Sequence, residues 1–250
     1  MSYAGKVVLI TGASAGIGAV AAINFTKEGA DVAIVGRNEN KLKQVVDKCK
    51  EVGRTPLAIK ADVANDEDAK RIIKETVDRF GKLDILVNNA GIGAYGTILN
   101  GEILKTYDDV MAVNVRAVVH LTSLAAPHLV KTKGNIVNVS SAAGFKVSTS
   151  PPQIAYCVSK AAVNHFTLGA ALELAPSGVR VNAVNPGPTR TDFLQTADAP
   201  ISWDDFERKT ALGRVSEPEE VVDLILFVAS EKAKGITGST LLVDNGRLLV

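Results

Sequence analysis

Residues 6–18 read Lys-Val-Val-Leu-Ile-Thr-Gly-Ala-Ser-Ala-Gly-Ile-Gly, so a short apolar run is followed at once by a glycine-rich turn. The run Lys6–Ile10 predicts a buried strand, and the residues after the turn predict a helix over Ile17–Glu28. A strand, a glycine turn and a helix in this order are typical of a dinucleotide-binding unit. The spacing, Gly-x-x-x-Gly-x-Gly, is not the commoner Gly-x-Gly-x-x-Gly, and a plain strand-to-helix turn is the alternative.

The three glycines of this turn have different predicted uses. Gly12 permits the tight bend, Gly16 lets the backbone approach a pyrophosphate, and Gly18 allows close packing of the helix. The free N–H groups at the helix N-terminus would then hold the phosphates. The other candidate contacts in the turn are Ser14, Ala15 and Ile17.

The same unit recurs along the chain. Continuous apolar runs, rather than alternating ones, indicate strands that are buried on both faces of a parallel sheet. The predicted strands are Lys6–Ile10, Asp31–Val35, Leu57–Lys60, Asp84–Val87, Gly134–Val139, Val179–Val184 and Thr240–Val243. The predicted helices are Ile17–Glu28, Glu39–Glu51, Asp66–Phe80, Ile103–Val130, Ile154–Ala175 and Glu217–Ala229. The fold class is therefore α/β, a Rossmann-type doubly wound parallel sheet of about seven strands flanked by helices.

Residues 1–250 are expected to form a single domain, because the sequence contains no linker, low-complexity tract or internal repeat. Asp192–Leu212 is longer and less regular than the other connections. It follows a strand end, where ligands bind in such sheets, and a substrate lid is favoured over a simple surface excursion.

The overall composition excludes several classes of partner. A net charge of +1, from 28 basic and 27 acidic residues, gives no electrostatic reason to expect nucleic acid or an anionic membrane. Cys49 and Cys157 have no metal-ligand spacing, so two free thiols and no metal are expected. The apolar stretch Ala117–Val130 falls short of the roughly 20 residues of a membrane span. No targeting segment is visible, and we expect a cytoplasmic protein.

The end of the second predicted strand bears on which dinucleotide binds. An acidic residue there would bind the ribose 2′-OH, but the chain has Gly36-Arg37-Asn38. No carboxylate opposes a 2′-phosphate, and the Arg37 guanidinium could bind one or stack on adenine, although an exposed surface arginine is the alternative. The missing acid favours NADP(H).

Tyr156 and Lys160 are four residues apart, so on a helix they lie on the same face. An ammonium beside a phenol lowers the phenol pKa from about 10, which would suit Tyr156 to acid–base catalysis. The pair Ser140-Ser141 ends a predicted strand just upstream, and strand alternation puts these two side chains on opposite faces.

With these residues identified, the chain resembles the short-chain dehydrogenase/reductase family over essentially its full length. The matching segments are Thr11–Gly18, Asn88-Asn89-Ala90-Gly91, Asn114, Ser140-Ser141, Tyr156-x-x-x-Lys160, and Asn185-Pro186-Gly187 with Thr191. The resemblance implies that Tyr156 is the acid/base and that Lys160 lowers its pKa and binds the nicotinamide ribose. It also implies that Ser141, the second serine, holds the substrate oxygen, and that Asn114 bends the long helix and positions a water.

The resemblance implies further contacts with the cofactor. Asp62 and Val63 resemble the pair that touches adenine, and Ala90 and Gly91 the wall beside its ribose. Asn88 would either contact the cofactor or stabilise a strand end. The segment expected to fix the nicotinamide contains Pro186, Gly187, Thr189 and Thr191; Asn38 completes the predicted cofactor contacts.

Two departures from the family pattern concern the substrate and the cofactor. Thr149-Ser150-Pro151-Pro152 lengthens the loop before Tyr156, and Ala15 stands where NADP(H)-preferring members often have a basic residue. Arg37 would then carry most of the preference, with Ser14 as a helper. The candidate substrate-lining residues are Gly93, Tyr95, Phe145, Phe193, Leu194, Ile201, Trp203 and Phe206. Packing of the lid onto the domain would explain these residues equally well.

The sequence thus predicts an NADP(H)-dependent oxidoreductase for a small carbonyl or alcohol substrate, with an apolar steroid, isoprenoid, aromatic or xenobiotic compound favoured. An NAD-dependent dehydrogenase and a ketoacyl-thioester reductase are alternatives of the same fold. A catalytically idle redox sensor or scaffold is the alternative from another class. The resemblance implies a homotetramer or homodimer, which apolar residues on Ile103–Val130, on Ile154–Ala175 and at Leu248-Leu249-Val250 would fit. Burial of these residues within one subunit is the alternative.

Overall fold

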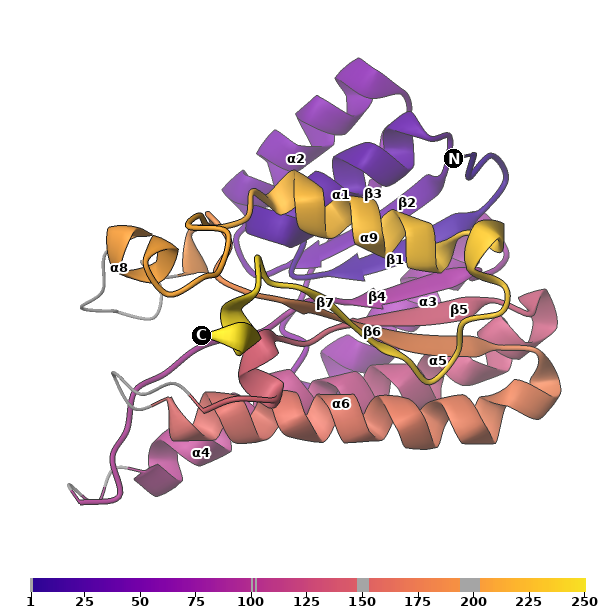
Figure 1. The fold of residues 1–250 in the computed structure, drawn as a ribbon. Coiled ribbons are helices and arrows are strands. Elements are labelled where there is room, and N and C mark those ends of the chain that lie inside the picture. Colours follow the sequence, from indigo (N-terminus) through magenta and orange to yellow (C-terminus); the bar gives the residue numbers. More distant parts are fainter. Residues whose placement is uncertain (1, 100, 102, 148–152, 194–202) are drawn as a thin grey trace.

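The structure, a computed structural model, describes residues 2–99, 101, 103–147, 153–193 and 203–250. Its strands form one seven-stranded sheet in the order β3-β2-β1-β4-β5-β6-β7 (Figure 1). The strands are β1 (Val7–Thr11), β2 (Asp31–Gly36), β3 (Leu57–Lys60), β4 (Ile85–Asn88), β5 (Asn135–Val139), β6 (Arg180–Pro186) and β7 (Thr240–Val243). Every neighbouring pair is parallel, which confirms the predicted doubly wound sheet.

Helices cover both faces of the sheet and bury an apolar cluster on each (Figure 1). One face packs against α1 (Gly16–Lys27), α2 (Glu39–Val52) and α9 (Pro218–Ala229). The other packs against α3 (Asp66–Phe80), α5 (Ala117–Thr132) and α6 (Ile154–Leu174). This burial on both faces explains why the strands are continuous apolar runs in the sequence.

The chain winds outward from β1 to β3 and then returns to add β4 on the other side of β1. The connections that leave β1 and β4 therefore run in opposite directions, and a crevice opens between the carboxyl ends of these strands. The glycine turn leaves β1 at this point, and Asn89-Ala90-Gly91 leaves β4. The topology thus brings the two segments to one edge of the sheet.

The predicted helix Ile103–Val130 is divided in the structure. It consists of α4 (Ile103–Met111), a π-helical turn at Ala112–Arg116, and α5. The expected bend at Asn114 lies in this turn, which places one extra residue in the winding and often occurs at functional sites. Asn114 accepts a hydrogen bond from the Ile92 N–H (2.8 Å) and donates one to its carbonyl (2.9 Å). These two hydrogen bonds hold the segment that follows β4 against the bend in the helix.

By length and composition, the continuous stretch Ile103–Thr132 could cross a membrane, with a mean hydropathy of 1.3. The sequence analysis considered only the apolar stretch Ala117–Val130, which is shorter than this continuous helical stretch. Core helices meet the same criterion, and α5 packs against α3 and α6 with Leu121, Ala125 and Leu129 in the core.

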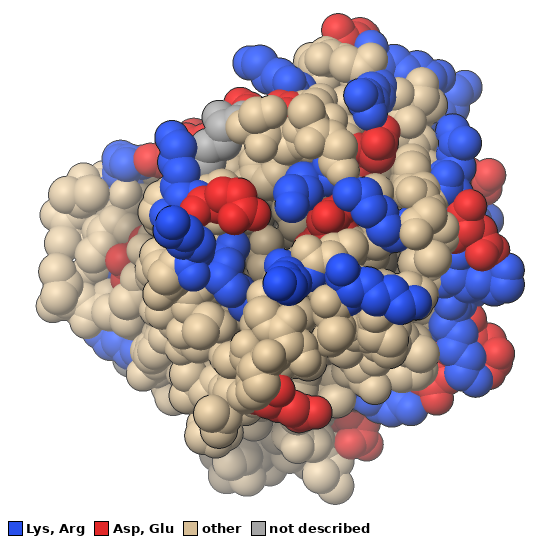
Figure 2. Space-filling model, turned by 90° about the vertical axis from the view of Figure 1, so that its right-hand side faces the viewer, with Lys and Arg blue, Asp and Glu red and all other residues tan. Residues whose placement is uncertain are grey.

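Basic side chains form a band across the face at the right of Figure 1, where the strands begin, with acidic groups among them (Figure 2). A cavity of about 420 Å³ at the strand starts contains Lys6, Arg180, Asp84 and Glu231. Both signs of charge therefore occur together there, as the balanced composition suggests.

Candidate active site

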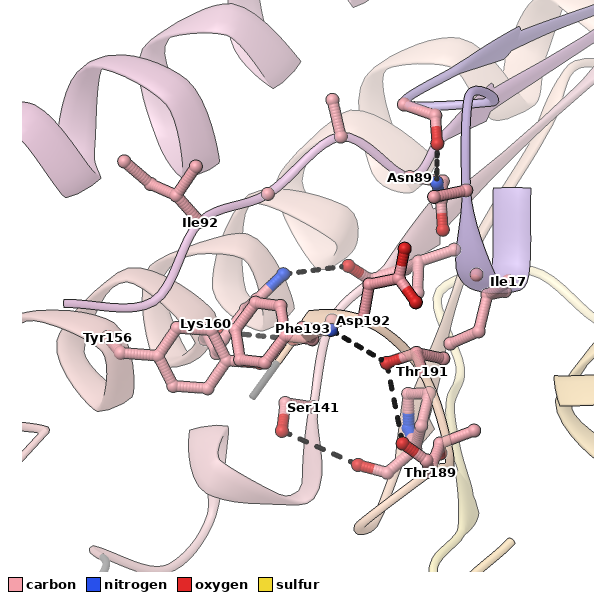
Figure 3. Close-up of a pocket in the computed structure, with 18 of the residues that line it drawn as sticks. Ile17, Asn89, Ile92, Ser141, Tyr156, Lys160, Thr189, Thr191, Asp192 and Phe193 are labelled. Atoms are coloured by element: carbon pink, nitrogen blue, oxygen red, sulfur yellow. Dashed lines mark hydrogen bonds between the residues drawn. The ribbon is translucent and has the colours of Figure 1, made fainter. Parts of the chain in front are cut away.

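A larger cavity, of about 740 Å³, lies at the opposite edge, beside the carboxyl ends of the strands (Figure 3). It gathers most of the predicted site from connections that are far apart in the sequence. Its lining includes Gly12, Ser14, Ala15, Gly16, Ile17, Arg37, Asn38, Asp62, Val63, Ala90, Gly91, Ser141, Tyr156, Lys160, Pro186, Gly187, Thr189, Thr191, Phe193, Trp203 and Phe206. The predicted residues outside this lining are Gly18, Asn88, Gly93, Tyr95, Asn114 and Phe145.

The glycine turn is packed too tightly for other side chains. Gly12 has φ of +64°, and a Cβ there would lie 2.8 Å from the Ala90 Cα. At Gly18 a Cβ would lie 2.5 Å from both the Asn89 Nδ2 and the Gly12 carbonyl. Gly18 therefore serves helix packing, as predicted, while the backbone around Gly12 and Gly16 faces the cavity.

Asn89, to which the sequence analysis gave no role, holds this turn in place (Figure 3). Its side-chain amide donates to the carbonyls of Thr11 (2.9 Å) and Gly12 (3.2 Å). Its neighbour Asn88 is buried and donates to Asn138 Oδ1 at 2.9 Å. The geometry of Asn88 fits the strand-stabilising alternative, and Asn89 is the residue that reaches the cavity.

The segment after β6 closes against the glycine turn. Gly16 has φ of +52°, and a Cβ there would lie 3.2 Å from the Thr191 Cβ. The Thr189 hydroxyl donates to the Gly187 carbonyl at 3.1 Å, and the Thr191 Oγ1 accepts from the Phe193 N–H at 3.3 Å (Figure 3). The predicted nicotinamide-binding segment is thus ordered by its own hydroxyl groups.

On the β2 side, Arg37 is exposed over 68% of its side chain, and its guanidinium lies 3.9 Å from the Asp62 carboxylate. Asn38 caps α2, because its Oδ1 accepts from the Lys41 N–H at 3.0 Å. Lys41, which sequence reasoning missed, lines the cavity and forms an ion pair with Asp192 at 2.8 Å. Two cations therefore stand at this end of the cavity.

Ser141, Tyr156 and Lys160 face the other end of the cavity (Figure 3). The Lys160 Nζ lies 5.6 Å from the Tyr156 ring centroid and donates to the Val139 carbonyl at 3.0 Å. The Ser141 Oγ accepts from the Ala143 N–H at 3.1 Å. Ser140 is buried and donates to the Lys160 carbonyl at 3.0 Å, so its hydroxyl is used in holding α6.

The expected lowering of the Tyr156 pKa by Lys160 is not found. Burial raises the pKa of Tyr156 to about 12, and a hydrogen bond with Ser141 opposes this only in part. Burial also lowers the pKa of Lys160 to about 8. Desolvation disfavours the charged form of each group, and it is the largest cause of both shifts. Tyr156 is therefore a protonated phenol at neutral pH, which suits it to donate a proton.

Gly91 lies beside Asn114 and the ammonium group of Lys160. A Cβ at this position would lie 3.4 Å from Asn114 Oδ1 and 3.5 Å from Lys160 Nζ. Asn114 is buried behind the wall and also donates to Ser159 Oγ at 3.0 Å. Gly91 and the glycine turn both line the cavity.

Aromatic side chains line the part of the cavity near Tyr156. The Phe193 ring lies 5.6 Å from that of Tyr156, and Trp203 lies 6.2 Å from Phe206. Of the other predicted lining residues, Phe145 is half-exposed outside the cavity, and Tyr95 accepts a hydrogen bond from Gln153 at 2.9 Å. Leu194, Ile201 and the loop insertion 149–152 lie outside the described residues.

Comparisons with known proteins identify the family. Residues 12–247 match the family model described as enoyl-(acyl carrier protein) reductase. The chain is 40% identical to an A-factor type gamma-butyrolactone 1′-reductase of Streptomyces virginiae, covering 96% of this chain and 95% of the relative.

Solved structures show the same fold. A short-chain type dehydrogenase/reductase from Mycobacterium marinum superposes with a TM-score of 0.92 at 36% identity, covering 98% of this chain and 96% of that one. A 3-ketoacyl-(acyl-carrier-protein) reductase from Brucella melitensis, complexed with NADH, gives 0.89 at 35% identity, with 98% and 99% covered.

The fold and the family match together define a nicotinamide-dependent oxidoreductase that acts on carbonyl or alcohol groups. More particularly, the chain belongs to the short-chain dehydrogenase/reductase family.

Proposed function

We propose that this protein is an NADP(H)-dependent reductase or dehydrogenase whose cofactor lies along the 740 Å³ cavity. The observation that carries the proposal is the meeting of Ser141, Tyr156 and Lys160 with the glycine turn in one cavity. The exposed Arg37 and nearby Lys41, with no carboxylate in Gly36-Arg37-Asn38, support a 2′-phosphate. An NAD-dependent enzyme is the alternative, because the Brucella relative was solved in complex with NADH.

When bound, the nicotinamide would accept or supply the hydride. Tyr156 would give its phenolic proton to the carbonyl oxygen during reduction and take it back during oxidation. Ser141 would donate a hydrogen bond to the same oxygen, where negative charge develops. Lys160 would hold the nicotinamide ribose and place its ammonium near the phenol, and Asn114 would support it from behind Gly91.

The aromatic wall of Phe193, Trp203 and Phe206 supports an apolar carbonyl or alcohol substrate, such as a steroid, isoprenoid, aromatic or xenobiotic compound. A ketoacyl thioester is the second candidate, because the Brucella relative is named for that activity at 35% identity. An idle sensor is disfavoured by the intact Ser141, Tyr156 and Lys160.

Three properties outside the site belong to the same proposal. Residues 1–250 would act as one domain in the cytoplasm, with Asp192–Leu212 serving the substrate. Self-association as a homotetramer or homodimer is supported by exposed apolar residues on α4 and α6, namely Leu104, Val158, Leu168 and Leu172.

Fluorescence titration with NADPH and NADH, followed by turnover of the preferred one, tests the proposal. The carbonyl panel contains acetophenone, 2,3-butanedione and acetoacetyl-N-acetylcysteamine, and Tyr156→Phe is the matched control. Tighter NADPH binding, with turnover lost in the control, is expected. Binding of neither nucleotide, or equal turnover by Tyr156→Phe, would refute it.

A further inference from the structure

Arg190 lies between Thr189 and Thr191, in the segment proposed to hold the nicotinamide, but its own side chain points to different elements. It contacts α8 (Trp203–Glu207), the helix that carries Trp203 into the cavity wall. It also reaches Glu217, the N-cap of α9. A single side chain therefore joins the cofactor segment to the substrate side of the cavity.

The contacts of Arg190 are of three kinds. The Arg190 Nη2 lies 2.5 Å from the Glu207 Oε1, and the Arg190 Nε lies 3.3 Å from the Glu217 Oε1. The guanidinium carbon lies 5.6 Å from the centroid of the Trp203 ring, within the range of a cation–π contact. Isolated ion pairs at the surface are weak, but a planar guanidinium that is shared by two carboxylates and an indole forms a network.

The backbone beneath this side chain is itself held. The Arg190 N–H donates to the Ser216 carbonyl, and the Ser216 N–H donates to the Pro188 carbonyl, both at 2.9 Å. Thr189 and Ser216 form a parallel bridge. The starting point of the Arg190 side chain is thus fixed, whereas α8 is only five residues long and depends on outside contacts for its position.

We propose that Arg190 is a positioning residue: it holds Trp203 of α8 against the substrate end of the cavity through Glu207, Glu217 and the indole ring itself. This inference rests on the proposed function, because it assigns the wall to substrate binding. Arg190 does not line the cavity, so it acts through Trp203 and touches neither the substrate nor the reacting atoms.

Trp203 is the only tryptophan in the chain, so its fluorescence reports the position of this wall directly. Arg190→Met removes the charge while keeping much of the side-chain length. Arg190→Lys keeps the positive charge but lacks the planar guanidinium that can pair with two carboxylates at once. Arg208→Met is the matched control, because Arg208 also forms an ion pair with α8, to Asp205 at 2.6 Å, whereas the contacts with the Trp203 ring and with Glu217 belong to Arg190.

In Arg190→Met, we expect a red-shifted Trp203 emission and an about twofold rise in its quenching by acrylamide. The KM for acetophenone should rise about three- to tenfold, which corresponds to the loss of roughly one charge-assisted contact. The kcat and the Kd for NADPH should stay within about twofold, Arg190→Lys should recover part of the loss, and Arg208→Met should match the wild type.

Unchanged emission and KM in Arg190→Met would overturn the inference, and so would equal losses in kcat, KM and cofactor binding. If this variant does not fold, Glu207→Gln tests the same contact, and the same changes in Trp203 emission and quenching are expected. Should the wild type turn over none of the carbonyl probes, the proposed function fails, while Trp203 emission still judges the role of Arg190.

Discussion

Replacing Lys160 by Met is expected to stabilise the folded chain at neutral pH, although it removes a proposed catalytic group. Burial lowers the pKa of this lysine from 10.5 to about 8. At about 1.36 kcal/mol per unit, keeping the ammonium inside costs about 3 kcal/mol at pH 7. The lost hydrogen bond to the Val139 carbonyl would take back about 1 kcal/mol, leaving a net gain of about 2 kcal/mol.

The pH dependence gives the sign of this effect. Below pH 8 the folded and unfolded chains both hold the Lys160 proton, so the full cost is present. Between pH 8 and 10.5 the unfolded chain binds more protons, so wild-type stability rises with pH. The advantage of Lys160→Met should therefore shrink across this window and disappear near its upper end.

Urea unfolding of the wild type and the variant at pH 7 and pH 10, followed by Trp203 emission, measures the difference. Lys48→Met is the control, because it makes the same substitution at a lysine that is exposed on α2. A Lys160→Met variant that is less stable at pH 7, or a difference that is equal at both pH values, would refute the reasoning.

Three further substitutions test the cofactor site and the acid. Tyr156→Phe should reduce kcat by at least about a thousandfold while the NADPH Kd stays within about threefold, since only the proton donor is lost; steady-state kinetics and titration measure both. Arg37→Asp should shift the ratio of NADPH to NADH affinity toward NADH by about tenfold or more, and an unchanged ratio would remove Arg37 from the argument. Gly12→Ala should lower stability by about 1–3 kcal/mol and weaken dinucleotide binding, because φ is +64° and the new Cβ would lie 2.8 Å from the Ala90 Cα. Gly81→Ala is the control, because Gly81 also has a positive φ, of +78°, but has open space around it. A thermal melt of both variants therefore separates the cost of backbone strain from the cost of the steric clash at Gly12.

The sheet was predictable because local signals agree with the global fold. All seven strands follow from apolar runs, and α3 was predicted with its observed bounds, Asp66–Phe80, because Asn65 and three acidic residues mark its start. The π-helical turn at Ala112–Arg116 could not be read from periodicity, because a single inserted residue hardly alters a helical pattern.

In the site, the sequence predicts a residue's role well where the local backbone allows only one residue type. It predicts the role poorly where tertiary contacts determine what the side chain does. The glycine turn is an example of the first, since only glycine fits at Gly12. Asn89 and Lys41 are examples of the second, because their partners lie far along the chain, and Arg190 depends on contacts with two later helices. The raised pKa of Tyr156 likewise depends on burial, which four-residue spacing does not reveal.

The position of β1 between β2 and β4 has a kinetic consequence. Val8 pairs with Ile85 and Leu9 with Leu86, so the crevice between β1 and β4 exists only after segments more than seventy residues apart have met. Such a pairing has a loop-closure cost, and we expect it to form after the transition state. A dinucleotide that needs both walls would then find little to bind in the transition state. It should lengthen the lifetime of the native chain against unfolding while leaving the refolding rate nearly unchanged.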